Sequence, residues 1–389
     1  MIITLITSET LADFPPMITL LKTLALQKHE INFISPYRDD MWDQLDLPSA
    51  EHHYISEKES SWLTAYYPRR ITASIAFRFA RLFRKMLLNK IPSHFSSVIK
   101  NSDIVWILHE NTALLGGKRF IKKLDNYLYT MYELCIRDKK VPAIYKYAAS
   151  GAKLTVVPEY SRAHIAKAYY GLAEMPSVLS NKPIEHPRKR NMPISDSDVA
   201  KKVEDLEASG KKIIMYMGIL SDERPIEPIV EATCNNEEYI FAVLGARTPY
   251  LDTLQKKMGD RFVYLGAVKP PHHLEIASHA DIAYVSYTPN NGSINAVFCA
   301  PNKVYEFAGF GIPMLCNDNP GLKYTVEHNN MGVCVAELNT ESITFALEQI
   351  DSNYDAMSCA AISYYDSESV EDAVQKILER YQKIIKDKK

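Results

Sequence analysis

Short apolar, β-rich runs alternate along this chain with segments of helical periodicity, and this alternation constrains the fold most strongly. The pattern is typical of βα units around parallel sheets, whose strands are almost continuously apolar because both of their faces are covered. The runs that we expect to be strands are Ile2–Thr7, Ile31–Ser35, Ile104–Leu108, Leu128–Tyr132, Leu154–Val157, Ile213–Met217, Tyr239–Leu244, Phe262–Leu265, Ile282–Ser286, Ile312–Cys316 and Gly332–Val335.

The segment Asn181–Ser195 divides these runs into two sets. It contains three prolines and four basic residues and has no apolar periodicity, which is typical of a domain boundary. A chain of 389 residues is also longer than one hydrophobic core usually supports. We therefore expect an α/β protein with two doubly wound, Rossmann-like domains facing a cleft, over residues 1–182 and 195–366. The apolar pattern of residues 367–389 predicts a C-terminal helix.

Charge and cysteine usage exclude several classes of protein. Lys and Arg total 45 against 47 Asp and Glu, so no overall basic field would recruit a nucleic acid. The six cysteines show neither a CxxC pair nor metal-ligand spacing. The N-terminus lacks a basic signal-peptide region, and no apolar run reaches the length of a membrane span. We expect a reduced protein that is cytoplasmic or peripheral at the inner face of a membrane, and that needs no metal or other cofactor.

The segment Ala300–Asn319, APNKVYEFAGFGIPMLCNDN, is the most informative part of the sequence for function. A helix that opens at Pro301 or Asn302 would present free backbone N–H groups to an anion. Lys303 in its first turn would add a charge suited to a phosphate. Glu306 falls on the same face of the helix and could accept both hydroxyls of a ribose. The alternative is an ordinary capped helix with a surface Lys–Glu pair.

Residues 301–315, PNKVYEFAGFGIPML, resemble the "PNK-aromatic-E-x-x-x-x-G-x-P" segment of retaining nucleotide-sugar glycosyltransferases of glycosyltransferase family 4, which have the GT-B fold. Residues 216–224 are similar to the family loop "Y-x-G-x-x-x-x-x-R". The resemblance covers roughly residues 100–335. Its other pieces, in family order, are residues 128–134, 154–158, 161–163, 178–183, 243–245, 262–268 and 280–282.

The resemblance implies a function and a set of site residues. The chain would move a hexosyl or related sugar from a nucleoside diphosphate donor to a glycan or lipid-linked acceptor in bacterial surface polysaccharide synthesis, with retention. The C-terminal helix would cross back to the first domain, which binds the acceptor, while the second domain binds the donor. Arg224, Lys303 and Glu306 would be catalytic, and these three, with Val268 and Asn302, would bind the donor.

Two departures from the family pattern affect this interpretation. The family pairs two glutamates eight positions apart, but Phe298 stands where the partner of Glu306 would be. Tyr132 stands where many members have histidine. Glu110 and Glu133 are candidates for the acceptor side, the alternative being surface or core carboxylates. The missing carboxylate favours a second hypothesis, a non-catalytic GT-B binding protein, and a nucleotide-sugar epimerase or glycosyl phosphorylase is a third.

Residues 66–90 contain seven basic residues and no acidic one. On a helix, Arg78, Arg81, Arg84 and Lys85 would form one stripe and Ile75, Phe79, Leu82 and Met86 another. Such a helix suits an anionic membrane surface. The alternatives are a packed helix with a solvated basic face and an oligomer contact.

Two tempting motifs receive structural interpretations instead. Asp196-Ser-Asp198 resembles a metal-binding DxD motif but precedes a helix, where such residues are N-caps. His272, His273, Glu275 and His279 lack the spacing of a helical zinc site, so we expect them to be structural.

Overall fold

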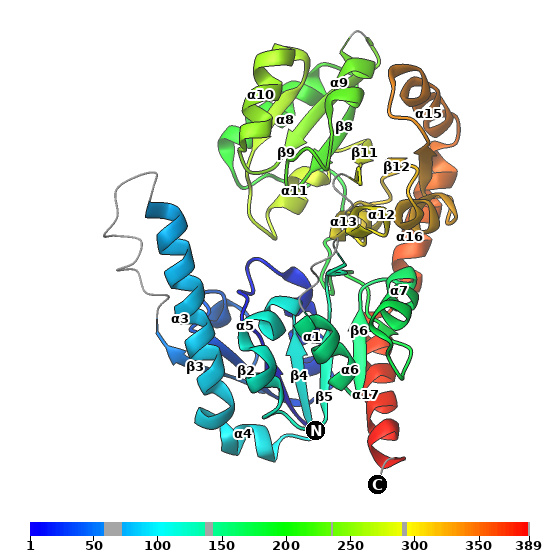
Figure 1. Ribbon diagram of the computed structural model, residues 1–389. Coiled ribbons are helices and arrows are strands. Elements are labelled where there is room, and N and C mark those ends of the chain that lie inside the picture. Colours follow the sequence, from blue (N-terminus) through cyan, green and yellow to red (C-terminus); the bar gives the residue numbers. More distant parts are fainter. Residues whose placement is uncertain (58–71, 137–142, 235, 290–293, 388–389) are drawn as a thin grey trace. The chain divides into compact units, whose positions relative to one another are not determined.

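A computed structural model of the chain describes residues 1–57, 72–136, 143–234, 236–289 and 294–387 (Figure 1). The chain divides into two compact units. The first contains residues 1–180 and 369–389, and the second contains residues 181–368. The proline-rich segment Asn181–Ser195 therefore begins the second unit.

In the first unit, the described residues form a seven-stranded parallel sheet with the order β3-β2-β1-β4-β5-β6-β7. Its strands are β1 (Ile2–Ile6), β2 (Glu30–Tyr37), β3 (Ala50–Ser56), β4 (Ile104–Leu108), β5 (Tyr127–Thr130), β6 (Leu154–Val157) and β7 (Ser177–Val178). Its helices are α1 (Pro15–Leu26), α3 (Thr72–His94), α4 (Ser96–Asn101), α5 (Glu110–Ile121), α6 (Ala143–Gly151), α7 (Tyr160–Tyr170) and α17 (Val370–Lys386).

The C-terminal helix α17 is part of the core of the first unit. It buries one apolar side, which includes Val374, Ile377 and Leu378, in the cluster that also holds Leu21 and Leu24 of α1 and alternate residues of β1, β2 and β4. Because side chains alternate along a strand, the intervening residues face the other side of the sheet. The last helix of the sequence thus completes the first domain rather than the second.

In the second unit, the described residues form a six-stranded parallel sheet with the order β10-β9-β8-β11-β12-β13. Its strands are β8 (Lys212–Met217), β9 (Tyr239–Leu244), β10 (Val263–Gly266), β11 (Ile282–Val285), β12 (Met314–Asn317) and β13 (Gly332–Val335). Its helices are α8 (Ser197–Ala208), α9 (Glu227–Thr233), α10 (Pro249–Met258), α11 (His273–Ala277), α12 (Ile294–Val297), α13 (Asn302–Gly309), α14 (Pro320–Leu322), α15 (Thr340–Ser352) and α16 (Tyr354–Ser367).

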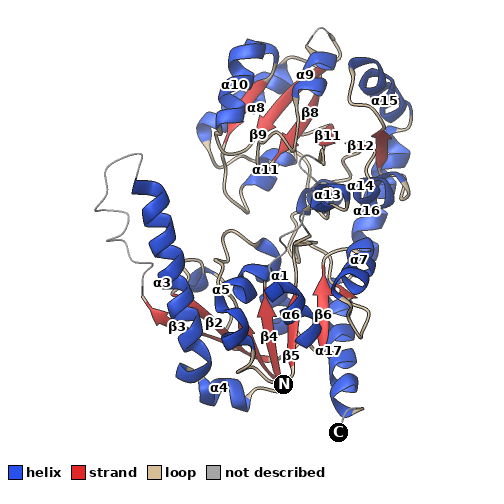
Figure 2. Cartoon of the chain, in the orientation of Figure 1, coloured by secondary structure: helices blue, strands red, loops and turns tan. Residues whose placement is uncertain are grey.

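Both faces of this second sheet are buried. Ile213 and Met215 of β8 belong to one apolar cluster with α8 and α13, whereas Ile214 and Tyr216 belong to another with α9 and α15. Figure 2 shows helices flanking the strands of each sheet. The expected fold class, two doubly wound parallel-sheet units with a C-terminal helix returning to the first, is therefore confirmed.

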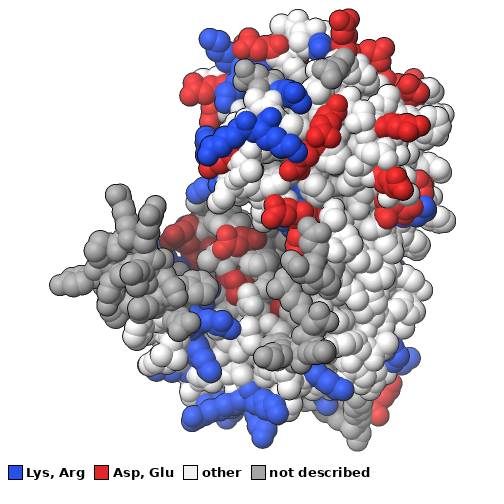
Figure 3. Space-filling model, turned by 45° about the horizontal axis from the view of Figure 1, so that its top comes forward, with Lys and Arg blue, Asp and Glu red and all other residues white. Residues whose placement is uncertain are grey.

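On the face drawn in Figure 3, both basic and acidic side chains appear and much of the area carries neither. Within the described part of the chain, no helix combines the length and the apolarity that crossing a bilayer requires.

Candidate functional site

Three glycines end three neighbouring strands of the second sheet. Gly218 follows β8, and its N–H donates to the carbonyl of Leu244, the last residue of β9 (2.9 Å). Gly245 follows β9, and its N–H donates to the carbonyl of Gly266, the last residue of β10 (2.8 Å). A Cβ at Gly245 would lie 2.1 Å from the Gly218 carbonyl oxygen, so the two turns approach too closely for a side chain. Ligands of open α/β sheets bind at this carboxyl edge of the strands.

Helix α13 begins at the same edge with an uncapped N-terminus. Its N-cap residue is Pro301, whose side chain makes no capping hydrogen bond. The backbone N–H groups of Asn302 and Lys303 stand in the first turn, where a helix offers no internal acceptor. The predicted helix start is therefore confirmed, and this N-terminal end of α13 is suited to bind an anion.

Lys303 holds a buried ammonium group beside this helix end. The side chain is 7% exposed, and its nitrogen has no hydrogen-bond acceptor among the residues that the structure describes. It lies 4.2 Å from the ring centre of Tyr216 and 5.6 Å from that of Tyr287. Burial, and secondarily the charge of Arg224, lowers the pKa of Lys303 to about 7. Such a cation is poorly stabilised until an anion reaches it.

Arg224 approaches the same group of aromatic rings. Its guanidinium carbon lies 5.1 Å from the ring centre of Tyr287, which follows β11. The backbone of Tyr287 is held by Asn317, which both accepts from its N–H (2.8 Å) and donates to its carbonyl (3.0 Å). The sequence analysis brought Arg224 and Lys303 to one site but missed Tyr287. An aromatic residue directly after an apolar strand was the available signal.

Glu306 lies one turn further along α13, with its side chain 14% exposed. Its Oε1 atom is 3.2 Å from Nε2 of His273, the first residue of α11. Its backbone carbonyl accepts a hydrogen bond from Nε2 of His186 (2.8 Å). The sequence analysis missed both histidines as neighbours of Glu306, because each lies far from it in the chain.

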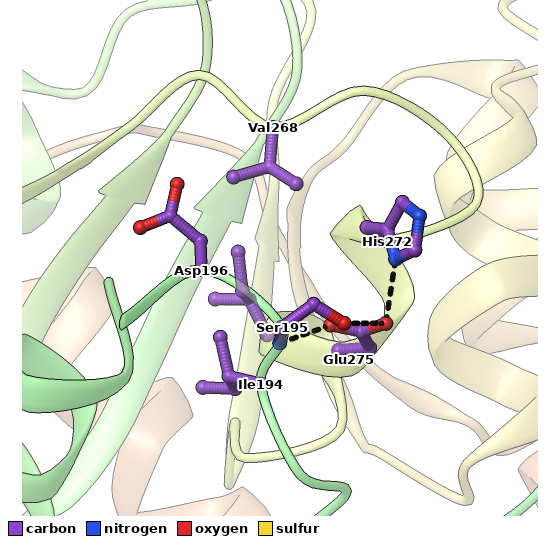
Figure 4. Close-up of a pocket in the computed structure, with 7 residues that line it drawn as sticks. Ile194, Ser195, Asp196, Val268, His272 and Glu275 are labelled. Atoms are coloured by element: carbon purple, nitrogen blue, oxygen red, sulfur yellow. Dashed lines mark hydrogen bonds and ion pairs between the residues drawn. The ribbon is translucent and has the colours of Figure 1, made fainter. Parts of the chain in front are cut away.

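A pocket of about 310 Å³ lies at the end of β10, where the predicted donor-binding residue Val268 is half-buried. Figure 4 shows Val268 with Ile194, Ser195 and Asp196, which lead into α8. Oδ1 of Asp196 accepts from the N–H groups of Asp198 and Val199 (3.1 Å each), so the predicted N-cap is confirmed.

His272 and His279, the other two histidines of the group for which we expected a structural role, have separate carboxylate partners. Nδ1 of His272 lies 2.7 Å from Glu275, which also accepts from Ser195, and Nδ1 of His279 lies 2.7 Å from Glu207. Among the described residues, no group of three or more His, Cys, Asp or Glu side chains is arranged to hold a metal ion.

In the first unit, the two candidate carboxylates occupy different environments. Glu110, at the start of α5, is buried, and its Oε2 accepts from the backbone N–H groups of Tyr132 (3.1 Å) and Glu133 (3.4 Å). Burial, and secondarily Glu133, raises the pKa of Glu110 to about 8. Glu133 is half-exposed and lies 3.5 Å from Arg162. Of the two, Glu133 is the one that solvent can reach.

Part of the basic amphipathic segment lies outside the described residues, namely 66–71. The rest belongs to α3, on which Phe79, Leu82 and Met86 are each more than half exposed. Arg81 and Lys85 are exposed on the same helix. The side chains of Ile75 and Arg78 lie outside the described part of the structure, and the described part of the apolar stripe is largely open to solvent.

The two doubly wound units define a GT-B fold, and comparison with solved structures agrees. No protein-family model and no curated protein matches the sequence. Anabaena Alr3699/HepE, solved with UDP and glucose, is similar at a TM-score of 0.70 and 12% identity, over 97% of this chain and 99% of that one.

Two further structures have the same architecture. Sucrose-phosphate synthase of Thermosynechococcus elongatus matches at a TM-score of 0.70 and 13% identity, over 99% of both chains. WaaG, a glycosyltransferase involved in lipopolysaccharide biosynthesis, matches at 0.59 and 13% identity, over 97% of this chain and 98% of that one. At such identities the likeness establishes the fold.

Proposed function

We propose that the protein is a glycosyltransferase that takes a sugar from a nucleoside diphosphate donor. The buried, acceptor-less ammonium of Lys303 carries this proposal. It stands in the first turn of α13, whose N-terminus has no side-chain cap, and close enough to Arg224 for the charge of that guanidinium to lower its pKa. A diphosphate supplies the missing negative charge. UDP bound to HepE supports a uridine donor as the first one to test.

The chemistry follows from where negative charge develops. As the bond between the sugar C1 and the diphosphate oxygen breaks, the leaving phosphate gains charge that Lys303, Arg224 and the α13 N–H groups stabilise without a metal. Removing one such donor typically raises the barrier by about 3–4 kcal/mol. For a retaining reaction, the acceptor oxygen bonds to C1 on the same face, and its proton passes to the departing phosphate. Glu306 binds the ribose hydroxyls, and Val268 lies beside the base.

The acceptor in this proposal is a glycan or a lipid-linked glycan of a bacterial surface polysaccharide, bound by the first unit. Glu133 is the more accessible carboxylate for an acceptor hydroxyl, and Glu110 fixes the neighbouring backbone. The exposed stripe of Phe79, Leu82 and Met86, flanked by cations, supports peripheral contact with an anionic bilayer. Sedimentation with anionic vesicles should exceed that with neutral ones, and Leu82→Glu should abolish the difference. Equal sedimentation with both vesicle types would refute the membrane contact.

Thermal unfolding with UDP, GDP, ADP, CMP and their common sugars tests the donor site. A ligand at about 100 times its Kd adds about 2.7 kcal/mol, which shifts the midpoint by several degrees. One nucleotide should shift the wild type but neither Lys303→Met nor Glu306→Ala. Turnover of the matching sugar donor, with the anomeric configuration of the product read by NMR, then tests transfer and retention. No shift with any nucleotide would refute the proposed donor site.

Phe298 supports one rival, a GT-B protein that binds a nucleotide without turnover. The residue cannot accept a hydrogen bond from a sugar hydroxyl through its side chain. Under this alternative, the nucleotide shift persists while transfer and hydrolysis of the donor both stay at background. Phe298→Glu, which introduces the missing carboxylate, should then raise the affinity for the sugar nucleotide relative to the nucleotide alone.

A further inference from the structure

We propose that His273 is a positioning residue that orients the Glu306 carboxylate for the ribose of the donor. The inference rests on the proposed donor site and adds to it a residue from a different helix. Nε2 of His273 lies 3.2 Å from Oε1 of Glu306, and both side chains are largely buried. With its proton on Nε2, the ring donates to one carboxylate oxygen and leaves Oε2 to accept from a ligand hydroxyl.

This hydrogen bond is the single polar restraint on each side chain within the described part of the chain. Nδ1 of His273 is buried there without a partner, so the ring takes part in no larger network. The Glu306 carboxylate accepts from no other described residue. A histidine in a structural network would use both ring nitrogens, as His279 does with Glu207 and the Met192 carbonyl. Among the described residues, His273 instead forms one hydrogen bond, and its partner is the Glu306 carboxylate.

The backbone of Glu306 is held independently of its side chain. His186 donates to the Glu306 carbonyl, and its ring packs directly over Gly309, where an added Cβ would lie 2.7 Å from the ring. Removing the His273 ring therefore leaves the backbone bond between His186 and α13 in place. We expect the Glu306 carboxylate to lose its orientation while the helix stays where it is.

The size of the effect follows from side-chain entropy. A glutamate side chain without a partner samples several rotamers, and fixing one such side chain on binding weakens affinity by roughly two- to tenfold. His273 fixes it before the ligand arrives. Removing His273 should therefore weaken only the part of the affinity that the ribose hydroxyls contribute. The proposed diphosphate contacts of Lys303 and Arg224 do not involve His273.

The test compares ribose with 2′-deoxyribose nucleotides. We would measure Kd by calorimetry for UDP and 2′-deoxy-UDP, and for the matching pairs of GDP, ADP and CDP. The variants are His273→Ala, His273→Gln, Glu306→Ala and His279→Ala. His279 is the matched control, because it is a nearby histidine that bonds Glu207 and the Met192 carbonyl instead.

The wild type should prefer the ribose form of one nucleotide, and His273→Ala should reduce that preference by roughly two- to tenfold. His273→Gln should restore most of it, since its amide can donate to Glu306, and His279→Ala should leave it unchanged. An unchanged preference in His273→Ala, together with a loss in Glu306→Ala, would overturn this inference and leave the donor site standing. No loss in Glu306→Ala, or no nucleotide binding by the wild type, would overturn both. Circular dichroism and the melting temperature identify a variant that fails to fold, and a folded His273→Gln without rescue also counts against the inference.

Discussion

Under the proposed function, the affinity for a sugar nucleotide should fall steeply above neutral pH, because Lys303 must be charged to bind the diphosphate. Burial lowers the pKa of this lysine from 10.5 to about 7. At pH 9 roughly one molecule in a hundred then carries the charge, so the affinity should be about a hundredfold weaker than at pH 6. The diphosphate of a sugar nucleotide is a diester that keeps its charge over this range.

Calorimetry between pH 6 and 9.5 measures this dependence. The logarithm of Kd should be level below pH 7 and rise by about one per pH unit above it. Lys303→Arg keeps its charge throughout this range, so the logarithm of Kd for this variant should not change with pH. Lys303→Met should bind weakly at every pH. The reasoning is wrong if wild-type affinity is level from pH 6 to 9, or if the slope survives in Lys303→Met.

The same lysine should make folding stability depend on pH. Its pKa is lower in the folded than in the unfolded chain, so the unfolded state holds more protons between pH 7 and 10.5. The free energy of unfolding should therefore gain, from this one group, up to about 5 kcal/mol as pH rises through that range, and lose it again on return to pH 7. The difference in urea unfolding between the wild type and Lys303→Met isolates this contribution. A difference that does not change with pH would refute it.

Three further outcomes are expected. Gly218→Ala places a Cβ 3.1 Å from the Lys303 nitrogen at φ +128° and should weaken nucleotide binding in calorimetry, whereas Gly210→Ala (φ +69°, open space) should lower only the melting temperature. In Glu110 the pKa is raised to about 8, so wild-type stability should fall as pH rises from 4.5 through 8, and Glu110→Gln should remove this decline in urea unfolding. Leu378→Ala in the buried side of α17 should destabilise the first unit by about 2–5 kcal/mol and leave the nucleotide-induced shift of the second unit unchanged.

The parts of the fold that sequence predicts well are those encoded locally. The runs in β1, β4 and β8 are buried on both faces, so their residues are almost continuously apolar and easy to recognise. The bounds of α13 are equally local, because proline at the N-cap and the glycines at and just after the end of the helix are read directly from the chain. These features required no knowledge of which elements meet in space.

Strand β3 was missed because it lies at the edge of its sheet. Its sequence, AEHHYIS, contains two histidines and a glutamate, and its residues are half-buried or exposed. An edge strand is covered less than a central one, so it lacks the apolar signal on which the prediction relied. The contacts of Glu306 with His186 and His273 could not be predicted from the sequence for a different reason. They join positions 120 and 33 residues apart, and no local pattern specifies such pairings.

Two features at the edge of the second sheet are unfavourable for stability, and one bound anion would compensate both. An uncapped helix end leaves N–H groups without acceptors, which typically costs about 1 kcal/mol. The ammonium of Lys303 is buried without an acceptor among the described residues, and Gly218 leaves room beside it that a Cβ would restrict. An anion such as the proposed diphosphate would accept hydrogen bonds from both groups. In the family resemblance, Phe298 stands where a carboxylate would bind the sugar, so under the proposed function we expect mutation to separate nucleotide binding from sugar transfer.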